Sequence, residues 1–133
     1  MTATVTWREG LAFAATSGSG HQVLLDGERK SGASPMEALL MAMGGCSGID
    51  VVLILQKMRE DVRGCRCALT AVRAEEDPKV FTRIHAHYVV SGKGLDPAKV
   101  ARAIALSAEK YCSASVMLGK TASISHDFEV IEA

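Results

Sequence analysis

The sequence predicts an α+β fold in which antiparallel sheets surround a long, buried central helix. Polar and apolar residues alternate near both ends and in the middle of the chain, as half-buried strands require. Two other segments repeat apolar residues at helical spacing, each after a capping residue and a proline. The predicted order is β-β-β-α-α-β-β-α-α-β, which favours an α+β arrangement over alternating β-α units.

The composition fits one soluble domain spanning residues 1–133. The 15 basic and 15 acidic residues cancel, which argues against binding to nucleic acid or to anionic membrane surfaces. With 48% hydrophobic and 23% charged residues the chain is expected to fold. Four cysteines are too few for a disulfide scaffold.

Short glycine-containing turns separate three strands at the N-terminus. Alternation over residues 2–8, 11–16 and 21–25 predicts an antiparallel meander. The charged stretch 27–33 that follows is predicted to be a surface loop.

A capping signal then predicts the start of a helix. Ser34 can cap, Pro35 suits the first helical position, and Glu37 completes a capping box. Because glycine is a poor helix former, Gly44-Gly45 is expected to break or kink this helix. A second helix, residues 46–60, is expected to follow.

This second helix is apolar on nearly every face, which predicts burial. One small meander cannot cover so much apolar surface, so a second copy of the chain is expected to complete the core. Residues 38–56 contain a single charge, Asp50, and approach the length of a membrane span. The mid-span acid and three glycines argue against insertion, and a cytoplasmic protein is expected.

The C-terminal half is predicted to hold a hairpin, two helices and a strand. The ranges are 65–75 and 81–91 for the hairpin around Asp77-Pro78, 96–110 and 111–118 for the helices, and 121–131 for the strand.

Two chelating pairs in the hairpin raise the possibility of a zinc site. They are Cys65 with Cys67, and His85 with His87. A turn centred near Pro78 places His87 opposite Leu69, so that Cys67 is only diagonal to it and a tetrahedral site does not assemble. No metal site is therefore predicted.

Cys46 is the first candidate for chemistry. It follows two glycines at the predicted start of a buried helix, where unpaired amides and the helix dipole would favour the thiolate. Cys112, which is 66 residues later and has Lys110 nearby, is the candidate second thiol. The alternative for each is an inert structural cysteine.

Several segments together resemble the OsmC/Ohr superfamily. The two cysteine motifs are residues 34–47 (SPMEALLMAMGGCS) and 108–113 (AEKYCS). Residues 5–11 (VTWREGL), 19–22 (SGHQ) and 124–126 (ISH) further resemble its YhfA-type branch. The resemblance runs over nearly the whole chain.

The resemblance implies an OsmC-like fold and an intertwined homodimer with two sites at its interface. It implies that Cys46 is the peroxidatic cysteine and Cys112 the resolving one. It also implies an external dithiol reductant, with no metal, haem or flavin as cofactor.

The chain departs from the Ohr-type pattern at one position. Active members place a glutamate directly after the motif proline, where it orients a catalytic arginine, and this chain has Met36 there. Glu37 lies one residue later, about 100° around the helix. Arg8 and Arg29 are the candidates for the arginine, and all four residues are weak candidates for binding or activating the substrate.

The leading functional hypothesis is a thiol-dependent reductase of organic hydroperoxides, or a related redox protein, in oxidative-stress defence. The alternative is a non-enzymatic dimer whose apolar interface pocket binds a small ligand, with Met36, Met41 and Met43 in its wall. A dimer with inert cysteines is a third possibility. The expected partners are a second copy of the chain, a small hydroperoxide or apolar ligand, and a dithiol.

Overall fold

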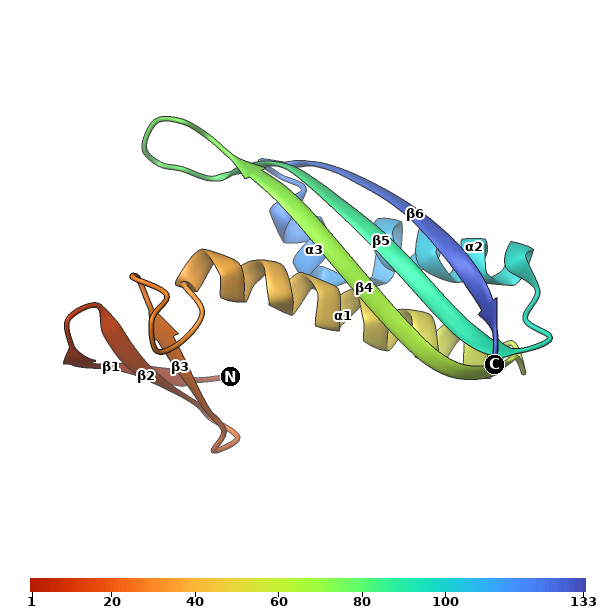
Figure 1. The fold of residues 1–133 in the computed structure, drawn as a ribbon, viewed down its shortest axis with the longest axis horizontal. Helices are drawn as coiled ribbons and strands as arrows, with labels where there is room; N and C mark the ends of the chain where they lie inside the picture. The colour runs from red at the N-terminus through yellow and green to blue at the C-terminus, as the bar shows by residue number, and fades with distance from the viewer. The chain divides into compact units, whose positions relative to one another are not determined.

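The computed structural model describes all 133 residues, which form two units, Met1–Leu40 and Met41–Ala133 (Figure 1). The elements in chain order are β1 (Ala3–Glu9), β2 (Ala12–Ser17), β3 (Gln22–Asp26), α1 (Pro35–Lys57), β4 (Asp61–Arg73), β5 (Phe81–Lys93), α2 (Pro97–Leu106), the π-helix η1 (Ser107–Tyr111), α3 (Ser113–Leu118) and β6 (Ser123–Glu132). Two three-stranded sheets and a long helix confirm the predicted α+β class.

The first unit contains the predicted meander. Its sheet has the order β1-β2-β3, and both pairs are antiparallel. The loop after β3 is organised by Asp26, whose carboxylate accepts hydrogen bonds from the backbone N–H groups of Glu28, Lys30 and Ser31. These bonds, with Ser31 contributing most, lower the pKa of Asp26 to about 2.

α1 begins with the predicted capping box. The Glu37 N–H donates to Ser34 Oγ at 3.1 Å, and the Ser34 N–H donates to Glu37 Oε1 at 2.9 Å. The expected break at Gly44-Gly45 is wrong, because one helix of 23 residues runs from Pro35 to Lys57.

The second unit packs its helices on one face of the sheet β4-β5-β6 (Figure 1). β5 alternates buried residues with partly exposed ones, and Ala86, Tyr88 and Val90 point into the core. They meet Val51 and Leu55 of α1, together with residues of α2. Burial of these side chains holds the sheet on the helices, and each of the larger aliphatic ones contributes about 1.5–3 kcal/mol to stability.

The strand pairing departs from the expectation in two ways. β4 and β5 are antiparallel, but β5 and β6 are parallel, which the helical connection between them permits. The predicted β4–β5 register is wrong by one residue, since His87 pairs with Ala68 rather than with Leu69. The loop closes between Ala74 and Val80, and an irregularity between Val72 and Arg73 shifts the pairs farther from the loop.

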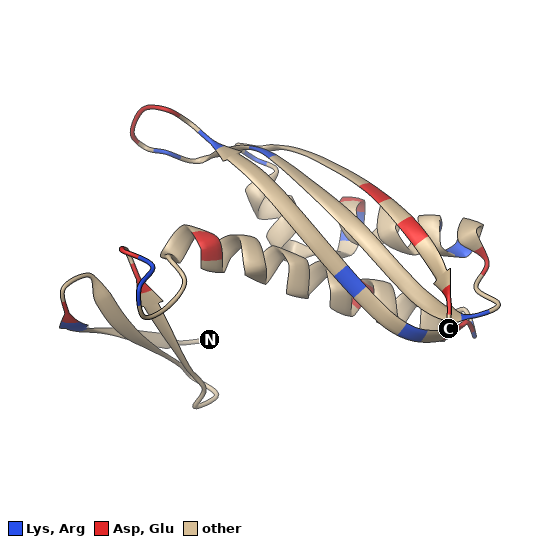
Figure 2. Cartoon of the chain, viewed as in Figure 1, with Lys and Arg blue, Asp and Glu red and all other residues tan.

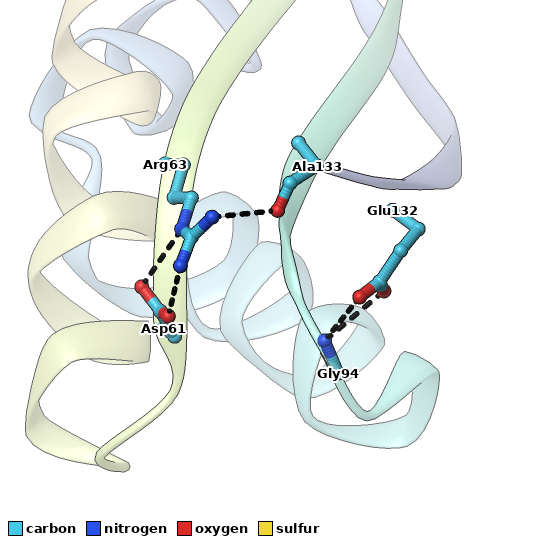
Figure 3. Close-up of polar contacts among 5 residues, drawn as sticks. All are labelled: Asp61, Arg63, Gly94, Glu132 and Ala133. Atoms are coloured by element: carbon cyan, nitrogen blue, oxygen red, sulfur yellow. Dashed lines mark hydrogen bonds and ion pairs between the residues drawn. The ribbon is translucent and has the colours of Figure 1, made fainter.

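Polar contacts fasten the end of this sheet where the chain terminates (Figure 3). Arg63 on β4 holds Asp61 at 2.9 Å and donates to the Ala133 carbonyl at 2.9 Å. The Glu132 carboxylate accepts from the Gly94 N–H beyond β5. β6 is therefore fixed at its last residues to both other strands.

Within this unit α1 is buried on one face only. Met43, Val51 and Leu55 are buried, whereas Ile49 is 62% exposed and Leu53 is 50% exposed. One chain therefore covers a single face of α1, and burial of the other faces by a second copy stays a prediction. Figure 2 shows how few charges interrupt the helix. By length and composition α1 could cross a membrane, with a mean hydropathy of 2.1, but its buried face packs against a protein core.

Candidate functional site

Cys46 lies in the middle of α1, half-buried, rather than at a helix start. The unpaired amides that were expected to favour its thiolate are therefore absent, because residues on both sides continue the helix. Gly44 has a packing role in this continuous helix. A Cβ atom on Gly44 would come within 2.7 Å of Leu69 Cδ1, so the missing side chain allows β4 to approach the helix closely.

Cys112 is fully buried, between η1 and α3, where the sequence predicts a boundary between helices. Its Sγ atom accepts a hydrogen bond from the Ser115 N–H at 3.3 Å and caps α3. Burial raises the pKa of Cys112, and the neighbouring Cys46 thiol adds to the increase. The fold thus brings together the two cysteines that the sequence analysis selected, and both are free thiols.

A chain of buried hydroxyl groups lies beside this thiol pair. Ser47 Oγ is 2.5 Å from the Tyr88 hydroxyl and 2.9 Å from Ser107 Oγ. Ser107 Oγ in turn donates to Asp50 Oδ2 at 3.0 Å. The chain connects α1, β5 and η1, and burial raises the pKa of Tyr88 to about 12.

Sequence reasoning missed these hydroxyl groups. Ser47 follows Cys46 directly, and the Ser107 carbonyl accepts the Cys112 N–H at 2.8 Å. The two serines therefore lie next to the thiols, Ser47 along the chain from Cys46 and Ser107 through a backbone hydrogen bond to Cys112. Nothing local identifies a serine in an apolar helix as the partner of a tyrosine 41 residues away.

Cys65 and Cys67 lie on the face of β4 that meets the core. Cys67 pairs with Tyr88 across the sheet. Burial raises the pKa of Cys65, and it raises that of Cys67 to about 11.

His85 and His87 lie on the opposite face of the sheet from these cysteines, since they pair with Thr70 and Ala68. Each imidazole has a nitrogen 2.8 Å from Asp127 Oδ1. These hydrogen bonds lower the pKa of Asp127, and the bond to His87 has the larger effect. The cysteine and histidine pairs cannot share a metal ion, and no His, Cys, Asp and Glu side chains are grouped to hold one.

An apolar groove of about 590 Å³ runs between α1 and β4. Cys65, Cys67 and Met41 lie in its wall, with Gly45 and Gly48 on the helix side. A Cβ atom on either glycine would meet nothing within 4 Å, so these residues keep the groove open. Of the methionines expected in such a pocket, Met41 is present, but Met43 is buried at 2% exposure and does not line it.

The remaining candidate residues belong to the unit Met1–Leu40. Glu37 is engaged in the capping box, and its bond to the Ser34 N–H lowers its pKa. Met36 is half-buried in the first turn of α1, Arg8 is exposed on β1, and Arg29 is exposed in the loop after β3. Neither arginine forms an ion pair, and their roles stay predictions.

Comparison with known proteins identifies close relatives of the chain. Residues 27–127 match the family described as OsmC-like protein. Protein YhfA of Escherichia coli strain K12 is 55% identical over 100% of both chains. A solved structure of a hypothetical protein from Aquifex aeolicus VF5 aligns with a TM-score of 0.90 at 29% identity, covering 99% of this chain and 96% of that one. The organic hydroperoxide resistance protein OhrB of Bacillus subtilis aligns with a TM-score of 0.65 at 20% identity, covering 97% and 98%.

We expect iodoacetamide at neutral pH to label Cys46 before Cys65 and Cys67. Burial raises the pKa of the two strand cysteines, so little of either is present as the reactive thiolate. Peptide mapping after limited labelling measures the order. Faster labelling of Cys65 or Cys67 would contradict the assignment of reactivity to α1.

We expect Tyr88 to make stability depend on pH in the alkaline range. Its folded pKa of about 12 exceeds the ordinary value of 10.0, so the folded protein keeps a proton that the unfolded chain loses. The free energy of unfolding should therefore fall as the pH rises from about 10 to 12. Urea unfolding should show a smaller fall for Tyr88→Phe, while Tyr111→Phe, at an exposed tyrosine, should behave like the wild type.

Proposed function

Because the chain belongs to the OsmC-like family, we propose that it is a thiol-dependent reductase of organic hydroperoxides, acting in oxidative-stress defence in the cytoplasm. The observation that supports the proposal is the proximity of Cys46 and Cys112, which are 66 residues apart in the sequence and are both free thiols. Similarity in fold to OhrB, an organic hydroperoxide resistance protein, supports the same class of reaction.

Cys46 is the attacking thiol in this mechanism. Its sulfur attacks the terminal oxygen of the hydroperoxide, the O–O bond breaks, and the alkoxide leaves as the alcohol after taking a proton. Cys46 is then a sulfenic acid. The half-buried position of Cys46, beside glycines that leave open space, suits approach by a small oxidant.

Cys112 resolves the sulfenic acid. Its thiol displaces the hydroxyl group of the Cys46 sulfenic acid, which forms the disulfide and releases water. An external dithiol then reduces the disulfide through a mixed disulfide and restores both thiols. No resident cofactor takes part in these steps.

Cysteine variants test this assignment. With stoichiometric cumene hydroperoxide, we expect intact mass and peptide mapping to show a Cys46–Cys112 disulfide. Cys112→Ser should stop at the sulfenic acid and pass to sulfinic acid with excess oxidant, and Cys46→Ser should abolish turnover. Cys65→Ser is the matched control and should keep turnover. If Cys46→Ser is as active as the wild type, the enzymatic proposal fails.

Met36 is expected to limit the rate. It occupies the position where Ohr-type members carry the glutamate that orients a catalytic arginine. We therefore expect Met36→Glu to raise kcat/KM for the hydroperoxide, with Met36→Gln, which lacks the charge, as the control. An unchanged rate in both variants would show that this carboxylate is not what the site lacks.

We also propose that the protein is a homodimer. The exposed fractions of Ile49 and Leu53 are 62% and 50%, on a helix that carries few charges. A second copy of the chain would remove this apolar surface from water. Sedimentation should show a dimer at micromolar concentration, and Ile49→Lys should shift it towards monomer. A stable folded wild-type monomer at that concentration would contradict the proposal.

The groove of about 590 Å³ favours a second candidate function, the binding of a small apolar ligand without turnover. Its volume lies in the range of small-molecule sites, and its wall is mainly aliphatic. The cysteine variants separate the two functions, because binding alone consumes no hydroperoxide.

A further inference from the structure

A second cavity, of about 450 Å³, lies where α1, α2 and η1 meet. Ile54, Met58 and Leu106 contribute apolar wall, and Tyr111 of η1 contributes an aromatic ring. No cysteine lines it, so its ligand is not the hydroperoxide that reacts at Cys46. The volume suits a ligand with an aliphatic body and a few polar groups.

The polar groups of this cavity are available for binding. Lys57 and Arg102 line it, and neither forms an ion pair within the chain. Asp50 also lines it, but Asp50 Oδ2 already accepts the Ser107 hydroxyl at 3.0 Å. Two unpaired cations against one carboxylate give the cavity a net positive charge.

The charge pattern selects a ligand class. A carboxylate would form charge-assisted hydrogen bonds to the Arg102 guanidinium, whose planar fork matches its two oxygens, with Lys57 as the second cation. Asp50 Oδ1 has no hydrogen bond within the chain, so it can accept one from a ligand hydroxyl or amino group. The aliphatic body would then lie against Ile54 and Leu106.

We propose that the cavity between α1, α2 and η1 binds a small aliphatic carboxylic acid that also carries a hydroxyl or amino group. This site goes beyond the proposed reductase activity and does not depend on it, although Leu53, at its edge, also belongs to the surface that the proposed dimer covers. It does adjoin the thiol pair, because Ser107 connects Asp50 to the backbone that holds Cys112. The intervening segment is a π-helix, a distortion that is frequent at functional sites.

An NMR titration of the ¹⁵N-labelled protein tests the proposal with three probes, each differing from the one before it in one group. They are 3-hydroxyoctanoate, octanoate, which lacks the 3-hydroxyl group, and 1-octanol, in which an uncharged CH₂OH group replaces the carboxylate of octanoate. We expect 3-hydroxyoctanoate to bind most tightly and to shift the amides of Ile54, Arg102 and Tyr111, which line this cavity and not the groove between α1 and β4. Octanoate should bind more weakly, and 1-octanol most weakly of the three.

Substitutions identify the groups responsible. Arg102→Ala should weaken binding of both acids by about tenfold or more, as expected for loss of a hydrogen bond to a charged group. Asp50→Ala should remove the preference for 3-hydroxyoctanoate over octanoate. Lys99→Ala, which removes a cation of α2 outside the cavity, is the control and should bind like the wild type.

Three results would overturn the proposal. They are no shifts at millimolar 3-hydroxyoctanoate, binding of 1-octanol as tight as that of the acids, and equal binding by the Arg102→Ala and Lys99→Ala variants. Hydroperoxide turnover, measured without any probe, reports separately on the thiols. Loss of turnover with intact probe binding would refute the proposed function and leave this site standing.

Discussion

The hydrogen bond between Ser47 and Tyr88, extended to Ser107, is the contact on which the thiol site depends. It holds α1 against β5 and η1 at the level of the two cysteines, with all three hydroxyl residues at 2% exposure or less. Removing one partner would leave buried polar groups unsatisfied, at about 1–3 kcal/mol each. The surrounding aliphatic packing supplies most of the stability, but these directional bonds fix the rotation of α1 and so the position of Cys46.

Sequence predicted those features whose partners are close along the chain. The capping box at Ser34 and Glu37 spans three residues, and glycine turns separate the strands of the meander, so both were readable from local pattern. The continuous helix through Gly44 could not be predicted in this way. The glycine allows close packing against Leu69, and only the folded structure brings Leu69 there. The β4–β5 register failed for a similar reason, since the irregularity between Val72 and Arg73, near the loop, shifts the pairs beyond it.

The candidate site divides in the same way. Cys46 and Cys112 were selected from two motifs, and the fold brings them together. The reason first given for the reactivity of Cys46, a helix start, is not what the structure provides. The amide donor is instead at Cys112, where Ser115 donates to the sulfur, and burial outweighs that bond in setting the pKa of Cys112. The two motifs thus come together as expected, but the local structure first given as the reason for reactivity is wrong, and the thiol chemistry itself stays a proposal.

A thiolate in such surroundings needs a positive charge nearby. The groups that act on Cys112 are its own burial, Ser115 and Cys46, and no cation is among them. Arg8 and Arg29 remain the candidates that the family resemblance leaves for this cation, and neither forms an ion pair. A free arginine is also less restricted in position than one held by a carboxylate, and Met36 cannot provide that restraint. The proposed enzyme would then have its thiols in place while its cation is weakly positioned, which predicts a functional but slow reductase.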